Sequence, residues 1–210
     1  TLFRSKLKSY AIDVRLSTMP VQHGEAVVMR LLDQSDGILS LTELGMDEEI
    51  KSRIQQVIRK PHGLFLVTGP TGSGKTTTLY AALSELNKPE YNIINVDDPH
   101  EYRQDRVNQF QVHEQIGLNF SKIMRTELRQ DPDIVLVGEM RDIETAQIGL
   151  RASITGHFVL STLHTNSAIG TISRLLDMGA PGYLMATALL AVLAQRLVRK
   201  VCTECVVPSQ

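Results

Sequence analysis

One eight-residue run in the sequence has the residue types and the spacing that hold phosphate groups. Residues 69–76 read GPTGSGKT and match the pattern G-x-x-x-x-G-K-[ST], with an apolar stretch before them and a helical stretch after them. The glycines let successive backbone N–H groups surround phosphate oxygens, and the N-terminus of the following helix adds partial positive charge. Lys75 can reach the β- and γ-phosphates of a nucleoside triphosphate, and the Thr76 hydroxyl can ligate Mg²⁺. We therefore predict that ATP and Mg²⁺ bind here, and the predicted nucleotide-binding residues are Gly69, Pro70, Thr71, Gly72, Ser73, Gly74, Lys75, Thr76 and Thr77.

A carboxylate that follows the apolar run 134–137 is the candidate for activating water. In open parallel sheets, ligands bind at the carboxyl ends of the strands, and Glu139 stands at such an end. We expect Glu139 to polarise the attacking water, either as a base or by orienting it. A generic motor has Asp immediately before this Glu, whereas this chain has Gly138. Metal ligation must therefore draw on Thr76 and on another acid.

The segment 97–101, with the sequence DDPHE, supplies that acid at the end of a second apolar run. Asp98 and Glu101 are the catalytic candidates of this segment. Asp98 and Glu139 are the carboxylate candidates for Mg²⁺, with contact through water as an alternative to direct ligation. The competing interpretation is a solvated turn with a helix cap, because Asp and Pro are ordinary turn residues.

Further candidate groups are a histidine and three arginines. His164 follows the apolar run 158–162 and could sense the γ-phosphate or donate a hydrogen bond to it, although a lone His is more often structural. Arg125 and Arg129 are four residues apart, so they would share one helix face. Together with Arg141 they could neutralise transition-state charge or bridge subunits, and the alternative is that they are ordinary surface arginines.

Two more arginines lie in a predicted hairpin near the N-terminus. If Thr18 pairs with Val27, Arg15 falls opposite Arg30. Like charges directly across a strand pair are destabilising, and an anion between them, such as a γ-phosphate from a neighbouring site, would remove the conflict. The alternative is a solvated face on which both arginines pair with nearby carboxylates.

The elements that position these groups follow from the apolar pattern. Short apolar runs alternate with stretches of helical spacing, which predicts an α/β fold with a mostly parallel sheet covered on both faces. The predicted hairpin strands are 13–18 and 26–32, around a turn at 19–25. The predicted core strands are 64–68, 93–96, 134–137 and 158–162, and the predicted helices are 46–60, 75–86, 142–153, one after Ile169, and a buried helix with a basic end at 184–194.

Composition limits the class of partner. The formal net charge is −1, Trp is absent and aromatic residues make up 5%, which argues against a nucleic-acid surface. The run 184–194 is too short to span a bilayer, and two cysteines exclude a disulfide framework, so we expect a cytoplasmic protein without a transmembrane segment. The chain begins on Thr1, and we expect it to be a piece of a longer protein.

Together these motifs resemble the secretion ATPase superfamily, which includes type II secretion motors and type IV pilus extension motors. The resemblance covers most of the chain from Asp13 onward, and the GEMRD form at 138–142 is closest to assembly motors of mannose-sensitive haemagglutinin-type pili. The matching stretches are RLSTMPVQHGEAVVMRLL, RKPHGLFLVTGPTGSGKTTTLYAAL, LRQDPDIVLVGEMRDIETAQIGLRASITGH, STLHTN and AVLAQRLVRKVC.

The resemblance implies a RecA-like P-loop NTPase core preceded by part of a PAS-like α+β domain, assembled as a homohexamer with ATP at each interface. It implies an ATPase that powers pilus assembly or type II secretion, peripherally associated with the cytoplasmic face of the inner membrane through a platform protein. The implied domains are 1–35 for the PAS-like part, 36–45 for the linker and 46–210 for the ATPase domain.

The resemblance also carries roles onto individual positions. The acidic box of the family maps onto 97–101, its Walker B Glu onto Glu139, its histidine box onto His164, and its phosphate-contacting arginines onto Arg15 and Arg30. This chain has Asp97 where the family usually has Glu, which weakens the assignment of that residue. The pair Cys202 and Cys205 resembles half of a four-cysteine zinc module; since structural zinc needs four ligands, we predict no complete zinc site.

Three other functions are compatible with a phosphate-binding loop. A RecA-like nucleic-acid translocase shares the loop and the arginines, but near-neutral charge and few aromatic residues disfavour it. A small kinase would leave the arginines and the hairpin without a purpose. A non-enzymatic protein could bind ATP only as a structural switch.

Overall fold

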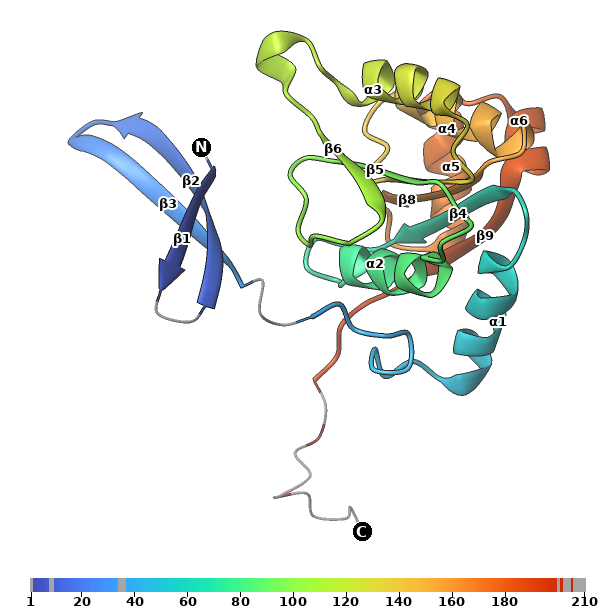
Figure 1. Cartoon of the computed structure of the whole chain (residues 1–210), viewed down its shortest axis with the longest axis horizontal. Coiled ribbons are helices and arrows are strands. Elements are labelled where there is room, and N and C mark those ends of the chain that lie inside the picture. Colours follow the sequence, from blue (N-terminus) through green and yellow to red (C-terminus); the bar gives the residue numbers. More distant parts are fainter. Residues whose placement is uncertain (1, 8–9, 34–36, 200, 202–204, 206–210) are drawn as a thin grey trace.

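The computed structural model describes residues 2–7, 10–33, 37–199, 201 and 205. Within that part of the chain, the core is one sheet whose neighbouring strands are all parallel, in the order β6-β5-β7-β8-β4-β9 (Figure 1). Because the strands are parallel, all of their carboxyl ends lie along one edge of the sheet. The strands are β4 (Gly63–Thr68), β5 (Ile93–Asp97), β6 (Val107–Gln111), β7 (Ile134–Val137), β8 (Phe158–Leu163) and β9 (Leu189–Ala194).

Helices cover both faces of this sheet (Figure 1). Residues of α1 and α2 pack with Phe65, Val67 and Leu160 in one buried cluster. Residues of the later helices pack with Leu64, Leu66 and other alternate strand positions in a second buried cluster on the opposite face. The helices are α1 (Glu48–Ile58), α2 (Lys75–Leu86), α3 (Phe120–Glu127), α4 (Ile143–Ile154), α5 (Ala168–Asp177) and α6 (Gly182–Ala188), with short 3₁₀ turns η1 (Glu114–Ile116) and η2 (Leu128–Gln130).

The N-terminus of α2 differs from the starts of α4 and α5. Asp142 caps α4 through Thr145 N–H, and Ser167 caps α5 through Gly170 N–H. By contrast, α2 follows Gly74 at φ +82°, and no described side chain accepts a hydrogen bond from its first turn in the manner of a cap. The first N–H groups of α2 are therefore available to a bound anion.

The predicted parallel α/β core is confirmed, and two segments differ from the prediction. The helix expected at 184–194 is wrong: α6 ends at Ala188, and the next six residues form β9, which pairs with β4. Pairing with the open edge of the sheet outweighs the helix propensity of the Leu- and Ala-rich sequence. Strand β6 was not predicted, because its polar residues lie on a half-buried edge strand without a continuous apolar run.

The N-terminal strands β1 (Leu2–Leu7), β2 (Tyr10–Val21) and β3 (Gly24–Asp33) form a separate antiparallel sheet. The expected register is confirmed, since Thr18 pairs with Val27 and Arg15 with Arg30. The turn is tighter than the expected 19–25, and β2 continues through Pro20. Strand β1 pairs with β2 only as far as Arg15. Pro20 therefore lies on a part of β2 whose other edge has no partner among the described strands, where the missing N–H is tolerated.

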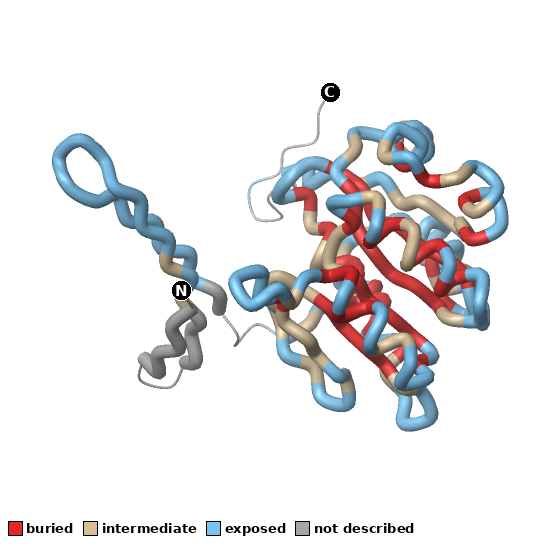
Figure 2. Tube along the Cα trace, turned by 90° about the horizontal axis from the view of Figure 1, so that it is seen from above, coloured by how far each residue is buried: buried red, intermediate tan, exposed pale blue. Residues whose placement is uncertain are grey.

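The β2–β3 hairpin is exposed along most of its length, whereas buried residues gather in the core (Figure 2). In the predicted linker, Leu41 is fully buried and packs under α1 and α2, so this segment is attached to the core. The PAS-like assignment of the N-terminal part and the exact domain limits remain predictions. Among the described residues, no helix has the length and apolar character needed to cross a membrane.

Candidate functional site

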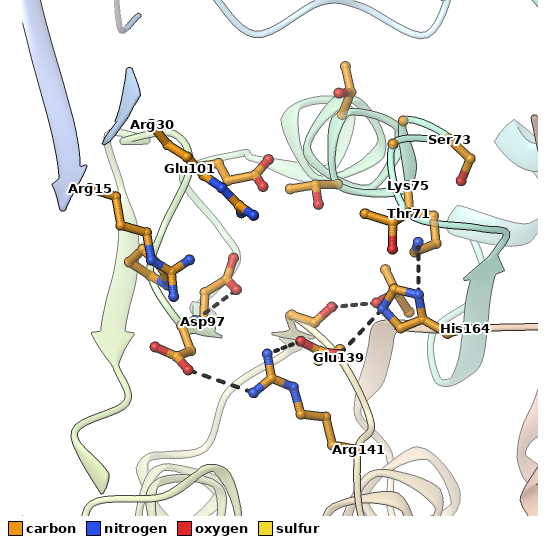
Figure 3. A pocket seen from close by; sticks show the side chains of 18 of the residues that line it. Arg15, Arg30, Thr71, Ser73, Lys75, Asp97, Glu101, Glu139, Arg141 and His164 are labelled. Carbon is orange, nitrogen blue, oxygen red and sulfur yellow. Dashed lines mark hydrogen bonds and ion pairs between the residues drawn. The ribbon is translucent and has the colours of Figure 1, made fainter. Parts of the chain in front are cut away.

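A pocket of about 650 Å³ lies at the carboxyl ends of the core strands (Figure 3). Loops after four strands meet there: the phosphate loop after β4, the acidic segment after β5, Glu139 after β7 and His164 after β8. The strand order of the sheet brings these loops together from distant parts of the sequence. The residues that line the pocket are Arg15, Arg30, 71–77, Asp97, Asp98, Pro99, Glu101, Gly138, Glu139, Arg141, Thr162, His164 and Leu197.

Lys75 lies at the centre of the phosphate loop with 8% of its surface exposed. Its Nζ donates hydrogen bonds to the carbonyl oxygens of Gly69 and Pro70, both at 3.0 Å, and lies 3.5 Å from Nδ1 of His164. Burial lowers the pKa of Lys75, and the negative charges of Glu139 and Glu101 oppose that decrease. The ammonium is thus held in the position from which it can reach a bound phosphate.

Glu139 is the predicted water-activating residue and stands in a network of charged groups. It forms an ion pair with Arg141, and its Oε2 lies 3.5 Å from Nε2 of His164. Arg141 also lies 3.8 Å from Oδ2 of Asp98, and its hydrogen bond to Glu139 raises the pKa of the guanidinium. Figure 3 shows Glu139 and Arg141, from the loop after β7, and His164, from the loop after β8, pointing toward one another in the pocket.

The acidic segment after β5 enters the same pocket, with a cis peptide bond between Asp98 and Pro99. Burial raises the pKa of Asp97 to about 7, and the nearby charges of Glu101 and Glu139 act in the same direction. Burial also raises the pKa of Glu101, while a hydrogen bond from the Thr76 side chain and the charge of Lys75 lower it. The segment leads into β6 and not into a helix, so it does not act as a helix cap. The catalytic and metal-binding roles of its acids stay predictions.

Arg15 and Arg30 extend from the hairpin into this pocket, opposite the phosphate loop (Figure 3). Their side chains point toward the acids Asp97 and Glu101 of their own chain. The structure contains one chain, so the assignment of both arginines to the site of a neighbouring subunit stays a prediction.

Comparison with known proteins decides the family. The family model described as Type II/IV secretion system protein matches residues 2–209. The chain belongs to this secretion family. It is 57% identical over 198 residues to the type II secretion system protein E of Aeromonas hydrophila, and 55% identical over 200 residues to the type II secretion system ATPase E of Vibrio cholerae serotype O1. These alignments cover 94% and 95% of this chain but only 40% of each relative, so the chain spans less than half of their length.

Solved structures of secretion-family proteins share the fold. The crystal structure of the pilus retraction motor PilT with bound ADP is 33% identical, with a TM-score of 0.79, over 97% of this chain and 60% of that one. The ATPase DotB of Legionella pneumophila is 25% identical, with a TM-score of 0.75, over 94% of this chain and 57% of that one. The core of this secretion-family chain is accordingly a RecA-like P-loop NTPase fold.

The structure does not bring Arg125 and Arg129 to the pocket lined by the described residues. Arg125 forms an exposed ion pair of 2.6 Å with Glu144. Helix α3 ends at Glu127, and Arg129 follows in the 3₁₀ turn η2, so the two arginines do not share one continuous helix face. A role at a subunit interface remains a prediction for both.

Gln195 was not a candidate in the sequence, although it holds the phosphate loop. Its Nε2 donates to the Ser73 carbonyl oxygen at 2.7 Å, and the Thr78 hydroxyl donates to its Oε1 at 2.9 Å. Its backbone N–H donates to the carbonyl oxygen of Thr68 at 2.9 Å. Because the preceding residues were assigned to a helix, the sequence offered no sign that Gln195 lies beside the end of β4.

Among the described residues, no three His, Cys, Asp or Glu side chains come together to hold a metal ion. Mg²⁺ in a nucleotide site keeps several waters and takes one or two protein ligands besides the phosphates, and its binding to this chain stays a prediction. Thr76, Asp98 and Glu139 all lie at the pocket, and Thr76 is next to Glu101. Of the two cysteines, Cys202 lies outside the described residues, Cys205 is an exposed thiol, and the absence of a complete zinc site remains a prediction.

Proposed function

We propose that this chain is the motor core of an ATP-hydrolysing secretion machine. One observation carries the proposal: Lys75, Glu139 and Arg141 meet in a single pocket with the acidic segment after β5 and with two arginines from another domain. A site that only held phosphate would need the loop alone. Acids and arginines placed around the γ-phosphate position are what transfer of a phosphoryl group to water requires.

Each side chain has a distinct part in the proposed reaction. The phosphate loop and Lys75 bind and orient the triphosphate, which fixes the γ-phosphoryl group for in-line attack. When Mg²⁺ is bound, it neutralises charge on the β- and γ-oxygens. Glu139 orients the water and accepts its proton once the carboxylate leaves its ion pair with Arg141. His164, 3.5 Å from both Glu139 and Lys75, donates a hydrogen bond to the γ-phosphate or to the water.

Arg15 and Arg30 make turnover depend on the position of the hairpin domain. A guanidinium placed at the γ-phosphate stabilises charge in the transition state, and such arginines are worth about 10³–10⁵ in rate. Because these residues lie on a different domain from Lys75, hydrolysis and phosphate release change the contacts between the domains. Movement of the hairpin domain against the core is the mechanical output we propose.

We further propose that the protein acts as a homohexamer with ATP at each subunit interface. It would work at the cytoplasmic face of the inner membrane, where it turns a platform protein of a pilus or secretion machine, without nucleic acid as a partner. The relatives described above are named for type II secretion, and the GEMRD form favours pilus assembly. Type II secretion or type IV pilus assembly is therefore the proposed process, and the solved retraction motor shows that pilus motors share this fold.

The test is the ATPase rate of the full-length protein at increasing protein concentration. We expect the rate to rise more steeply than linearly, because assembly completes the sites. Glu139→Gln should lower turnover about 10²–10⁴-fold and leave ATP binding intact, whereas Glu90→Gln, at an exposed glutamate outside the pocket, should behave like the wild type. Equal specific activity in dilute monomer and assembly would refute the interface, and full activity of Glu139→Gln would refute the assigned water-activating role.

A further inference from the structure

The backbone at Gly138 has no room for a side chain. A Cβ atom at this position would lie within 3.0 Å of Oδ1 of Asp97 and 2.8 Å from its Cγ, closer than real Cβ atoms approach other atoms. The backbone cannot easily move away, because Gly138 N–H donates to the Val96 carbonyl at 2.8 Å and its own carbonyl accepts from the Thr162 hydroxyl at 2.7 Å. The Asp97 carboxyl group therefore fills the space that a side chain at position 138 would occupy.

The carboxyl group of Asp97 is itself held in place. Its Oδ1 accepts a hydrogen bond from Asp98 N–H at 2.9 Å, and its Oδ2 lies 3.5 Å from the Tyr80 hydroxyl. That hydroxyl accepts from Nδ2 of Asn95 at 2.9 Å, and both Tyr80 and Asn95 are fully buried. Tyr80 belongs to α2, the helix that begins at the phosphate-loop residue Lys75. Asp97 is thus tied to the element that would carry the triphosphate.

The carboxyl group of Asp97 also lines the pocket, together with Glu101 and Glu139. It stands at the carboxyl end of β5, the strand that pairs with β7. The β5 strand therefore places a carboxylate beside Glu139, in the space that a side chain at position 138 would fill.

In many P-loop NTPases the loop Ser or Thr and an Asp on a neighbouring strand together hold the Mg²⁺ of the nucleotide. In this chain β7 is followed by Gly138 and Glu139, without that Asp. We propose that Asp97, at the end of β5, supplies the carboxylate that β7 lacks, and that position 138 is glycine in order to admit it. This inference rests on the proposed ATP hydrolysis, and it makes Asp97 a positioning residue that would act on the metal through a bound water.

The steric half of the proposal is tested by melting temperatures of nucleotide-free protein. Gly138→Ala should lower Tm by about 3–10 °C in the wild-type background, as expected for overpacking in a chain of this size. The same change in an Asp97→Ala background should lower Tm by less than about 2 °C, because the obstructing carboxyl group is gone. Gly149→Ala is the matched control: its Cβ would meet Met140 instead, so its effect should be the same in both backgrounds. Equal losses from Gly138→Ala in the two backgrounds would overturn the proposal.

The chemical half is tested by the affinity for ADP with Mg²⁺ and with EDTA in the full-length protein. Asp97→Asn should reduce the gain in affinity that Mg²⁺ provides by about 10–100-fold, the usual effect of losing an outer-shell partner of a metal, and should not lower the affinity in EDTA, because it removes a negative charge from the pocket. The double variant Asp97→Ala/Gly138→Asp, which moves the carboxylate to β7, should recover most of that gain, while Asp97→Ala alone should not.

Each result of this second experiment has a defined meaning. A loss of affinity that is equal with and without Mg²⁺ would show that Asp97 is only structural and would overturn the inference, as would an unchanged Mg²⁺ gain in Asp97→Asn. The proposed function is tested separately, by the turnover of the wild type and Glu139→Gln. If Mg²⁺ raises the affinity for ADP only when Asp97 is present, and the protein does not hydrolyse ATP, the proposed motor function would be refuted. The proposal that Asp97 supplies the carboxylate missing from β7 would then still be supported.

Discussion

Replacing Asp97 with Asn should stabilise the nucleotide-free protein at neutral and alkaline pH, and this gain should shrink as the pH falls. Burial, with repulsion from Glu101 and Glu139, raises the pKa of Asp97 from 3.8 to about 7 in the folded protein. An Asn side chain has the same size and cannot ionise. The substitution therefore removes the cost of charging this site and preserves most of its packing.

The direction of the pH dependence follows from the two pKa values. Below about pH 4 the Asp97 carboxyl is protonated in both the folded and the unfolded state, and its contribution to stability is fully present. Between about pH 4 and pH 7 only the unfolded state loses the proton, so the wild type loses stability as the pH rises, by at most about 1.4 kcal/mol per pH unit. Above about pH 7 the loss is complete. A difference of about three between the folded and unfolded pKa values corresponds to about 4 kcal/mol. Relaxation of the site and entry of water lower the expected difference in stability between Asp97→Asn and the wild type to about 2–4 kcal/mol at pH 8.

The assay is urea unfolding of both proteins at several pH values from 5 to 8, in EDTA and without nucleotide. The contributions of the other ionisable groups cancel when the free energy of unfolding of the wild type is subtracted from that of Asp97→Asn. This difference should rise between pH 5 and pH 7 and level off above pH 7. Asp177→Asn, at an exposed residue of α5, is the matched control and should show no such rise. A difference that stays constant from pH 5 to pH 8, or a less stable Asn variant at pH 8, would refute the argument that burial governs this carboxyl group.

Three further predictions concern the phosphate loop and the surface. Lys75→Ala should weaken ATP binding by about 10–100-fold, the equivalent of a lost hydrogen bond to a charged group, as measured by titration with a fluorescent nucleotide; unchanged affinity would contradict the loop assignment. Gln195→Ala should lower the free energy of unfolding by about 1–3 kcal/mol, because the amide links the loop to Thr78, and chemical denaturation will detect it; a change below about 0.5 kcal/mol would show that the link is dispensable. Arg125→Ala should change monomer stability by less than about 1 kcal/mol, because its ion pair with Glu144 is exposed. A loss of ATPase activity in that variant only at assembling concentrations would then report a subunit interface, whereas a loss in the monomer would contradict this view.

The four central strands of the core, β5, β7, β8 and β4, could be predicted almost residue by residue, and the reason is physical. Strands such as 134–137 are buried on both faces and therefore appear as short, continuous apolar runs between turn residues. Edge strands lack that signature. Strand β6 is only half-buried, and β9 has a Leu- and Ala-rich sequence that suits a helix equally well until the open edge of β4 is known to be present.

The candidate site likewise has residues whose place could be predicted from the sequence and others whose place could not. The place of Lys75 could be predicted from the loop pattern, and those of Glu139 and His164 because they stand just after apolar strands, since parallel strands bring their carboxyl ends to one edge. The hydrogen bonds between Gln195 and the phosphate loop could not be predicted from the sequence, and neither could the close approach of the Asp97 carboxyl group to Gly138. Both depend on which strands are neighbours in the sheet, and the spacing of residues along the chain does not contain that information.

The charges of the pocket lead us to expect that the hairpin influences nucleotide affinity. Among the described residues that line the pocket, four are carboxylates, Asp97, Asp98, Glu101 and Glu139, and the core contributes two permanent cations, Lys75 and Arg141. This excess of negative charge would repel a nucleoside triphosphate, even one that carries Mg²⁺. Arg15 and Arg30 bring the formal charge of the lining to balance, counting each carboxylate as ionised. We therefore predict that nucleotide affinity depends on the position of the hairpin, because these two arginines are not part of the core that holds the phosphate loop.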